Sequence, residues 1–176
     1  MKFLSKVFAI CLPFLGQSKE RSRLDMIQEM LPKLAAIESS GNPYAMGDGG
    51  KSIGMYQISK NAWKDACDWQ RLKDNDLTEF LSWVEIGKDW KKECFDEEKS
   101  RLIAMCYLLM LAEKISAYGH KVDERKLYMA YNMGFSQAKK FNFNMNNVLL
   151  SDKKKAIFYR ASVILDSHLT FPPRRR

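Results

Sequence analysis

A chain of 176 residues fits one domain, and 46% hydrophobic with 28% charged residues is the composition of a folded globular protein. These values exclude a chain that is disordered over its whole length. Lysine and arginine number 29 against 21 acidic residues, which gives a net charge of +8. A basic surface favours a polyanionic partner such as nucleic acid, anionic lipid or an acidic cell-wall polymer, and the sign of the charge alone does not choose among them.

The first stretch, MKFLSKVFAICLPFLGQS, has the pattern of a secretory signal peptide. Lys2 gives a positive start, a short apolar segment follows, and small residues at its end suit cleavage. The alternative is an apolar first helix that docks on the domain. The stretch is too short for a stable membrane span. We therefore expect export to the periplasm or the extracellular space. The expected organisation is a candidate signal peptide over residues 1–18, one folded domain over residues 19–170 and a basic tail over residues 171–176.

The hydrophobic pattern predicts a mainly α-helical domain. In the first helix, expected over residues 22–37, Ile27, Leu31 and Leu34 form one apolar stripe. Pro32 is expected to kink this helix or to start a new turn. The following Ser-Ser-Gly-Asn-Pro should end it, because glycine, asparagine and proline do not continue a helix.

Residues 44–54 are rich in glycine and predict a tight loop, with room for at most a small β-hairpin near residues 51–60. A polar, poorly periodic stretch covers residues 73–98. The apolar run within residues 99–118 predicts the central buried helix. Further helices are expected at about 59–68, at 123–131 with Asp123 as its cap, and at 153–166.

The four cysteines, Cys11, Cys67, Cys94 and Cys106, form no Cys-x-x-Cys pair, and the two histidines are isolated. This spacing gives no support to a zinc site. A Cys67–Cys94 disulfide is compatible with the sequence, but spacing cannot establish it. The sequence therefore predicts neither a metal nor a cofactor.

Glu38 is the strongest candidate for acid chemistry. It follows the apolar Ala35-Ala36-Ile37 in the last turn of a predicted helix. The negative end of the helix dipole and apolar neighbours both disfavour a carboxylate, so both should raise its pKa. A general acid that works near neutral pH needs such a shift. The ordinary alternative for a lone glutamate at a helix end is a solvated side chain.

Three ordered motifs accompany Glu38. Glu38-Ser39 closes the helix, the glycine-bearing loop leads to Gly54-Met55-Tyr56-Gln57-Ile58, and Ala130-Tyr131-Asn132-Met133-Gly134 lies further on, followed by the aromatic segment around Tyr159. This arrangement resembles the goose-type lysozyme and lytic transglycosylase superfamily over about residues 26–165. The resemblance implies a lysozyme-like single domain that is mainly α with at most a small hairpin.

The resemblance also implies what each residue does. Glu38 would be the catalytic acid that protonates the glycosidic oxygen between N-acetylmuramic acid and N-acetylglucosamine. Substrate-binding roles are implied for Ser39, Asp48, Ser52, Gly54, Gln57, Tyr131, Asn132 and Tyr159. Several of them have an ordinary structural alternative: a helix cap for Ser39, loop or turn roles for Asp48, Ser52, Gly54 and Gln57, and core aromatics for Tyr131 and Tyr159.

With one carboxylate, the resemblance implies a lytic transglycosylase, in which Glu38 acts as acid and then as base to form 1,6-anhydro-N-acetylmuramic acid ends. Two alternatives remain open. Asp48 could position a water and make the protein a hydrolase like goose-type lysozymes, or the domain could bind peptidoglycan without cleaving it.

The implied partner is the glycan strand of peptidoglycan. Similarity to compact, stand-alone members of the superfamily suggests local opening of the wall for secretion systems, pili or phage. The basic runs Lys153–Lys155 and Arg174–Arg176 also suggest nucleic-acid binding as an alternative, but no recognised motif accompanies them. We interpret these runs as solvated surface, and expect no specific nucleic-acid partner.

Overall fold

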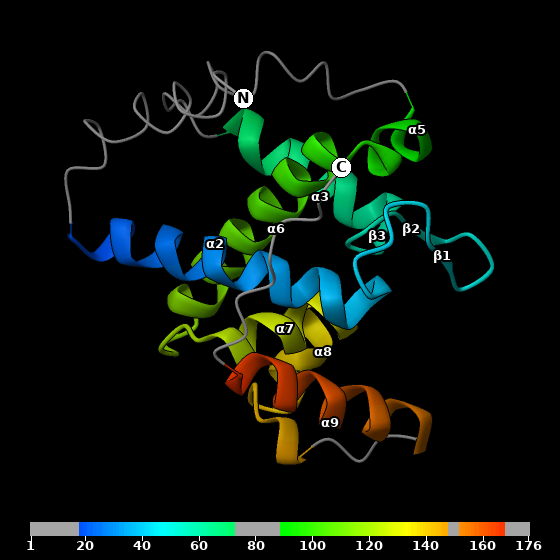
Figure 1. The fold of residues 1–176 in the computed structure, drawn as a ribbon. Helices are drawn as coiled ribbons and strands as arrows, with labels where there is room; N and C mark the ends of the chain where they lie inside the picture. The colour runs from blue at the N-terminus through cyan, green and yellow to red at the C-terminus, as the bar shows by residue number, and fades with distance from the viewer. Residues whose placement is uncertain (1–17, 73–88, 148–151, 168–176) are drawn as a thin grey trace.

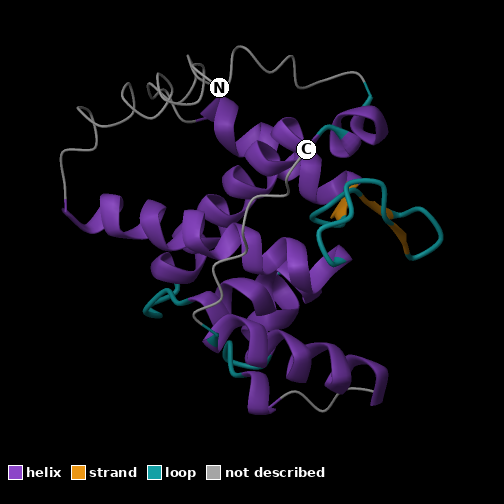
Figure 2. Cartoon of the chain, in the orientation of Figure 1, coloured by secondary structure: helices purple, strands orange, loops and turns teal. Residues whose placement is uncertain are grey.

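The computed structural model describes residues 18–72, 89–147 and 152–167. Most of the candidate leader, the basic tail and residues 73–88 of the polar stretch 73–98 lie outside these residues. In chain order, and with the labels of Figure 1, the elements are α2 (Ser18–Ser39), β1 (Met46–Gly47), β2 (Ser52–Ile53), β3 (Ile58–Ser59), α3 (Lys60–Leu72), α5 (Trp90–Phe95), α6 (Glu97–Ala117), α7 (Glu124–Met133), α8 (Phe135–Lys140), the 3-10 turn η1 (Met145–Asn147) and α9 (Asp152–Asp166). The domain is therefore mainly α-helical, as predicted (Figure 2).

Helix α2 crosses the middle of the molecule, between α3 and α6 on one side and α7 and α9 on the other (Figure 1). The predicted stripe is buried, since Ile27, Leu31 and Leu34 are each at most 1% exposed. Pro32 lies inside one continuous helix, so it does not divide α2 into two helices. Its side chain is exposed, so water can reach the carbonyl that loses its intrahelical partner.

Helix α6 is the central buried helix, as predicted. Its buried residues include neighbours in sequence, such as Ile103 with Ala104 and Leu111 with Ala112, and therefore point in several directions. Helices α2, α3, α5 and α7 all contact it. Among the described residues, no helix is long and apolar enough to cross a membrane.

A three-stranded antiparallel sheet, in the order β1-β2-β3, lies beside the C-terminal end of α2 (Figure 1). Ile53 of β2 faces Met46 of β1 and Ile58 of β3. The hairpin predicted near residues 51–60 is thus confirmed, but the loop predicted over residues 44–54 contains one further strand. Strands of two residues are too short to show an alternating pattern, which is why the sequence did not reveal β1.

Helix α9 is anchored to both α2 and α7. Lys33 of α2 donates to both carboxylate oxygens of Glu124, at 3.1 and 2.9 Å, and to the Leu165 carbonyl at 3.0 Å. The ring of Phe158 meets that of Tyr128 edge to face, with centroids 5.7 Å apart. These contacts fix the C-terminal helix against the two helices that carry the motifs.

Cys67, Cys94 and Cys106 are buried, and none of the three is in a disulfide. The Cys67–Cys94 disulfide considered from the sequence is therefore not formed in this structure. Burial, as the largest cause, raises the pKa of Cys94 to about 12, and that of Cys106 likewise. Both groups are protonated small hydrophobes at neutral pH.

Candidate active site

Glu38 lies in the last turn of α2, where this helix meets the sheet and α7. Its side chain is partly buried, and Oε1 is fully buried without a hydrogen-bond partner in the described structure. Buried polar atoms are nearly always paired, so this carboxyl oxygen needs an explanation, and a functional role is one. The placement at a buried helix end agrees with the prediction from the sequence.

Burial raises the pKa of Glu38 from its ordinary value of 4.5 to about 7. Side-chain hydrogen bonds with Asn132 and Tyr128 lower the pKa and offset part of this effect. Asp48 raises it by charge repulsion, and Arg160 lowers it by attraction. Because burial outweighs the stabilising groups, the carboxyl group is divided between its acid and base forms at neutral pH.

Tyr128 and Asn132 of α7 form the wall of the site next to Glu38. The Asn132 amide Nδ2 donates to the Tyr128 hydroxyl at 3.3 Å, and these positions are four apart, so they share one helix face. Tyr128 is fully buried. Burial is the main cause that raises its pKa, and the negative charge of Glu38 adds to it. The hydroxyl therefore stays protonated and can donate to the Glu38 carboxylate.

Three of the predicted site residues hold successive carbonyl groups of the turn Gly54–Tyr56, which follows β2. Gln57 Nε2 donates to the Gly54 carbonyl at 2.9 Å. Ser39 donates to the Met55 carbonyl at 2.7 Å, and Tyr131 donates to the Tyr56 carbonyl at 2.7 Å. These side chains therefore brace the turn beside Glu38.

Two glycines in and near this turn lie very close to other residues. Gly54 has φ 79°, and a β carbon there would lie 2.0 Å from the carbonyl oxygen of Cys94 in α5. A β carbon at Gly47 would lie 2.2 Å from Oε1 of Gln57. Gly54 needs glycine because backbone fills the space, whereas a β carbon at Gly47 would require the Gln57 side chain to shift. The close approach that Gly54 permits in this structure is to the backbone of α5.

Three other predicted residues, Asp48, Ser52 and Tyr159, take no part in the hydrogen bonds that hold this turn in the described structure. Asp48 has φ 49° in the exposed turn between β1 and β2, a conformation that aspartate tolerates better than most residues. Ser52 lies in β2, opposite Gly47 and Ser59. Tyr159 is 74% exposed on α9, so it is not a core aromatic.

Two residues near Glu38 were not predicted from the sequence. Tyr128 was passed over because an aromatic at helical spacing is most often core. Its position four residues before Asn132 could have placed it on the same face. Arg160 lies in the helix expected over residues 153–166, and nothing in its local sequence shows that it reaches α2.

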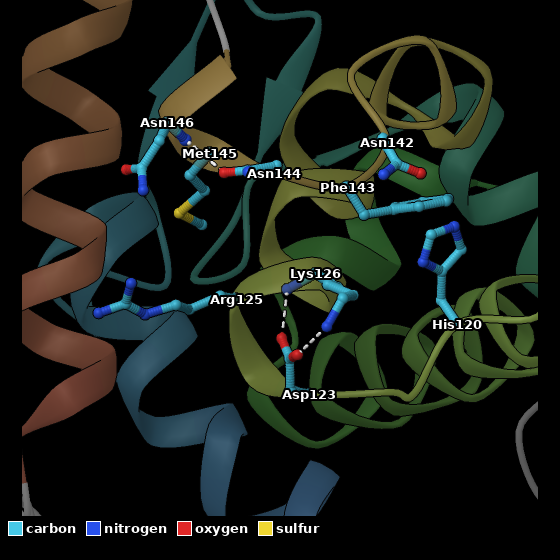
Figure 3. A pocket seen from close by; sticks show the side chains of 9 residues that line it. All are labelled: His120, Asp123, Arg125, Lys126, Asn142, Phe143, Asn144, Met145 and Asn146. Carbon is cyan, nitrogen blue, oxygen red and sulfur yellow. Dashed lines mark hydrogen bonds and ion pairs between the residues drawn. The ribbon is translucent and has the colours of Figure 1, made fainter.

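A separate hollow of about 370 Å³ lies at the opposite end of α7 (Figure 3). His120, Asn142 and Asn144 are among its lining residues. Its cations are engaged: Lys126 pairs with the N-cap Asp123, as the dashed lines show, and Arg125 pairs with Asp166. Asp123 and Asn132 lie nine positions apart on α7, or about 13 Å along a helix axis. This hollow is therefore distinct from the Glu38 site.

No group of three or more histidine, cysteine, aspartate or glutamate side chains suited to a metal occurs in the parts of the chain that the structure describes. The chemistry available at Glu38 is that of a single carboxyl group with hydrogen-bonding neighbours. Such a group can donate a proton and take one back.

Comparison with known proteins agrees with this geometry. Residues 17–149 match the family model of the transglycosylase SLT domain, and this range holds Glu38 and all the motif residues except Tyr159. No curated protein and no solved structure gives a significant match. The match covers well over half of the chain. The chain therefore belongs to the transglycosylase SLT domain family, whose members cleave glycosidic bonds of peptidoglycan.

Proposed function

We propose that this protein is a lytic transglycosylase that cleaves the β-1,4 bond between N-acetylmuramic acid and N-acetylglucosamine, with Glu38 as its single acid and base. The observation that carries the proposal is the Glu38 carboxyl group, whose Oε1 is buried and unpaired and whose pKa burial raises to about 7. Such a group can be protonated when the substrate arrives and ionised after the first step.

In the first step, the Glu38 acid gives its proton to the glycosidic oxygen. The bond from C1 of N-acetylmuramic acid to that oxygen breaks, and its electron pair leaves with N-acetylglucosamine. In the second step, the C6 hydroxyl oxygen of the same muramic acid bonds to C1 and loses its proton to the Glu38 carboxylate. The product has a 1,6-anhydro end, no water is consumed, and Glu38 is protonated again.

The neighbours of Glu38 support both halves of this cycle. Burial favours the acid form before the first step. Tyr128 and Asn132 can donate to the carboxylate that the first step produces. The same contacts argue against a binding module without chemistry, since a buried carboxyl group has a cost in stability that binding alone does not require.

Asp48 favours a second candidate, hydrolysis. Its charge acts on Glu38, and an acidic loop residue there could orient a water toward C1. Its exposure and its turn conformation favour the transglycosylase, because they account for Asp48 without catalysis.

Mass spectrometry of the muropeptides released from purified peptidoglycan tests the proposal. Anhydro ends, each lighter than a reducing end by one water, are expected. Glu38→Gln should abolish release, whereas Glu29→Gln, an exposed position on the same helix, should not. Reducing ends would identify a hydrolase. Undiminished release by Glu38→Gln would show that the assigned acid is wrong.

The net charge of +8 suits an anionic wall polymer. Export to that wall, guided by the candidate signal peptide over residues 1–18, belongs to this proposal, and so does a role in opening the wall for a secretion system, a pilus or phage. Determining the N-terminus of the mature protein tests export: a start near Lys19 is expected.

A further inference from the structure

Arg160 connects the C-terminal helix α9 to the helix end that carries Glu38. Its Nη2 donates one hydrogen to the Ala36 carbonyl oxygen, at 3.0 Å, and one to Ser40 Oγ, at 3.2 Å. Ala36 precedes Glu38 by two residues, and Ser40 follows it by two. The guanidinium therefore bridges the last turn of α2 across the position of Glu38.

The end of α2 lacks a cation of its own. Its last turn contains no basic residue, although a positive charge there would stabilise the negative end of the helix dipole. The chain leaves the helix through Ser40 and Gly41, both with positive φ, of 55° and 74°. Arg160 supplies the missing charge from another element and holds the first residue of this exit turn.

Arg160 is also the only positive charge among the groups that act on the Glu38 carboxyl in the described structure. These groups are Tyr128 and Asn132 from α7, Asp48 from the turn between β1 and β2, and Arg160 from α9. The charge of Glu38 also acts on Tyr131 of α7, whose pKa is raised mainly by burial and further by this charge. Arg160 lowers the pKa of Glu38, whereas Asp48 raises it, so Arg160 favours the ionised form of Glu38.

The position of α9 is well defined. Opposite its Arg160 contact, Lys33 of α2 donates to Leu165 near the other end of α9. Ala161, next to Arg160, is fully buried. Residue 160 lies beyond the matched range 17–149, so the family match does not assign it a role.

We propose that Arg160 is a positioning residue, which fixes the C-terminal turn of α2 around Glu38 and stabilises the carboxylate that forms after proton donation. This inference rests on the proposed function, because it assigns Arg160 a part in the same acid–base cycle. Arg160 acts on Glu38 through its charge and through its bonds to the flanking residues Ala36 and Ser40, so it is not itself a catalytic residue.

Replacing Arg160 by methionine keeps much of the length and removes the charge. The titration of Glu38 can be followed by carbon-13 NMR on the full chain labelled at glutamate, with the Glu38 signal identified by its loss in Glu38→Gln. Arg160→Met should raise the midpoint by about half a pH unit, a modest shift because the arginine side chain is exposed and screened by solvent. The alkaline limb of muropeptide release should move upward by the same amount. The midpoint of Arg160→Lys should lie closer to that of the wild type.

Arg125→Met is the matched control. Arg125 is likewise exposed and links α7 to α9 through Asp166, but it lies at the other end of α7. Its loss should leave the midpoint unchanged. Added salt should shrink the difference between Arg160→Met and the wild type. An unchanged midpoint in Arg160→Met, or equal shifts in both variants, would overturn the role of Arg160. A wild-type protein that releases no muropeptides would overturn the proposed function instead, while the NMR titration would still decide whether Arg160 acts on Glu38.

Discussion

Tyr131 and Tyr56 lie 75 residues apart, and the hydroxyl of Tyr131 donates a 2.7 Å hydrogen bond to the carbonyl oxygen of Tyr56. Together with the bonds from Ser39 to Met55 and from Gln57 to Gly54, this contact holds the turn Gly54–Tyr56 from α2, from α7 and from the residue that directly follows the turn. The residues that the motifs single out thus build the surroundings of Glu38 by holding backbone, and the geometry of the site depends on them together.

Tyr131→Phe should weaken this brace without opening a cavity. The Tyr56 carbonyl would lose its partner, at a cost of about 1 kcal/mol in the free energy of unfolding. Muropeptide release should fall because the turn beside Glu38 is less well fixed. Urea unfolding together with release assays measures both effects. Tyr159→Phe, at a 74% exposed position, should leave stability unchanged. Equal losses of stability from the two substitutions would contradict the bracing role.

Gly54→Ala should be much more disruptive than Gly49→Ala. Both positions have positive φ, of 79° and 66°, so both substitutions carry about 1 kcal/mol of backbone strain. Only at Gly54 would the new β carbon meet backbone, 2.0 Å from the Cys94 carbonyl oxygen, whereas nothing lies within 4 Å at Gly49. Thermal unfolding of the two variants should differ clearly, and equal melting temperatures would show that α5 moves away freely.

The sequence predicted much of this arrangement because its signals are local. Glu38 at a helix end, Asp123 as the cap of α7 and the apolar run of α6 are all visible within a few residues. The six-residue helices α5 and α8 were missed because a stretch this short shows little helical periodicity.

The site was predicted less completely, since its remaining parts depend on packing. Arg160 reaches Ala36 across 124 positions, and no local pattern reveals such a contact. The acceptors in Gly54–Tyr56 are backbone carbonyl groups, which every residue has. The sequence therefore does not indicate that these three carbonyl groups bind Ser39, Gln57 and Tyr131. The motifs single out Ser39, Gln57 and Tyr131, and the structure shows which backbone groups these side chains bind.

Asp48→Asn should shift the alkaline limb of activity in the direction opposite to Arg160→Met. The negative charge of Asp48 raises the pKa of Glu38, so its removal should lower that pKa and the limb should move to lower pH. Asparagine also tolerates the conformation at φ 49°, which keeps the turn intact. Muropeptides released by this variant should still carry anhydro ends. If release stopped, Asp48 would have a direct part in the reaction, as the hydrolase alternative requires.

Glu38→Gln should make the protein less sensitive to alkaline pH while it abolishes activity. The pKa of Glu38 in the fold, about 7, lies above its ordinary value of 4.5. Folding therefore favours the protonated form, and the stability from this site is full below pH 4.5 and is lost as the pH rises through 7.

Glutamine cannot ionise, so the variant should not lose the stability that the wild type loses between pH 4.5 and pH 8. Over this range the free energy of unfolding should fall by on the order of 2 kcal/mol less in the variant than in the wild type. Melting temperatures measured from pH 4.5 to pH 8, with Glu29→Gln as the control on the same helix, test this difference. Parallel curves for Glu38→Gln and the wild type would mean that burial of this carboxyl group has no cost in stability, and the acid–base assignment would lose its physical basis.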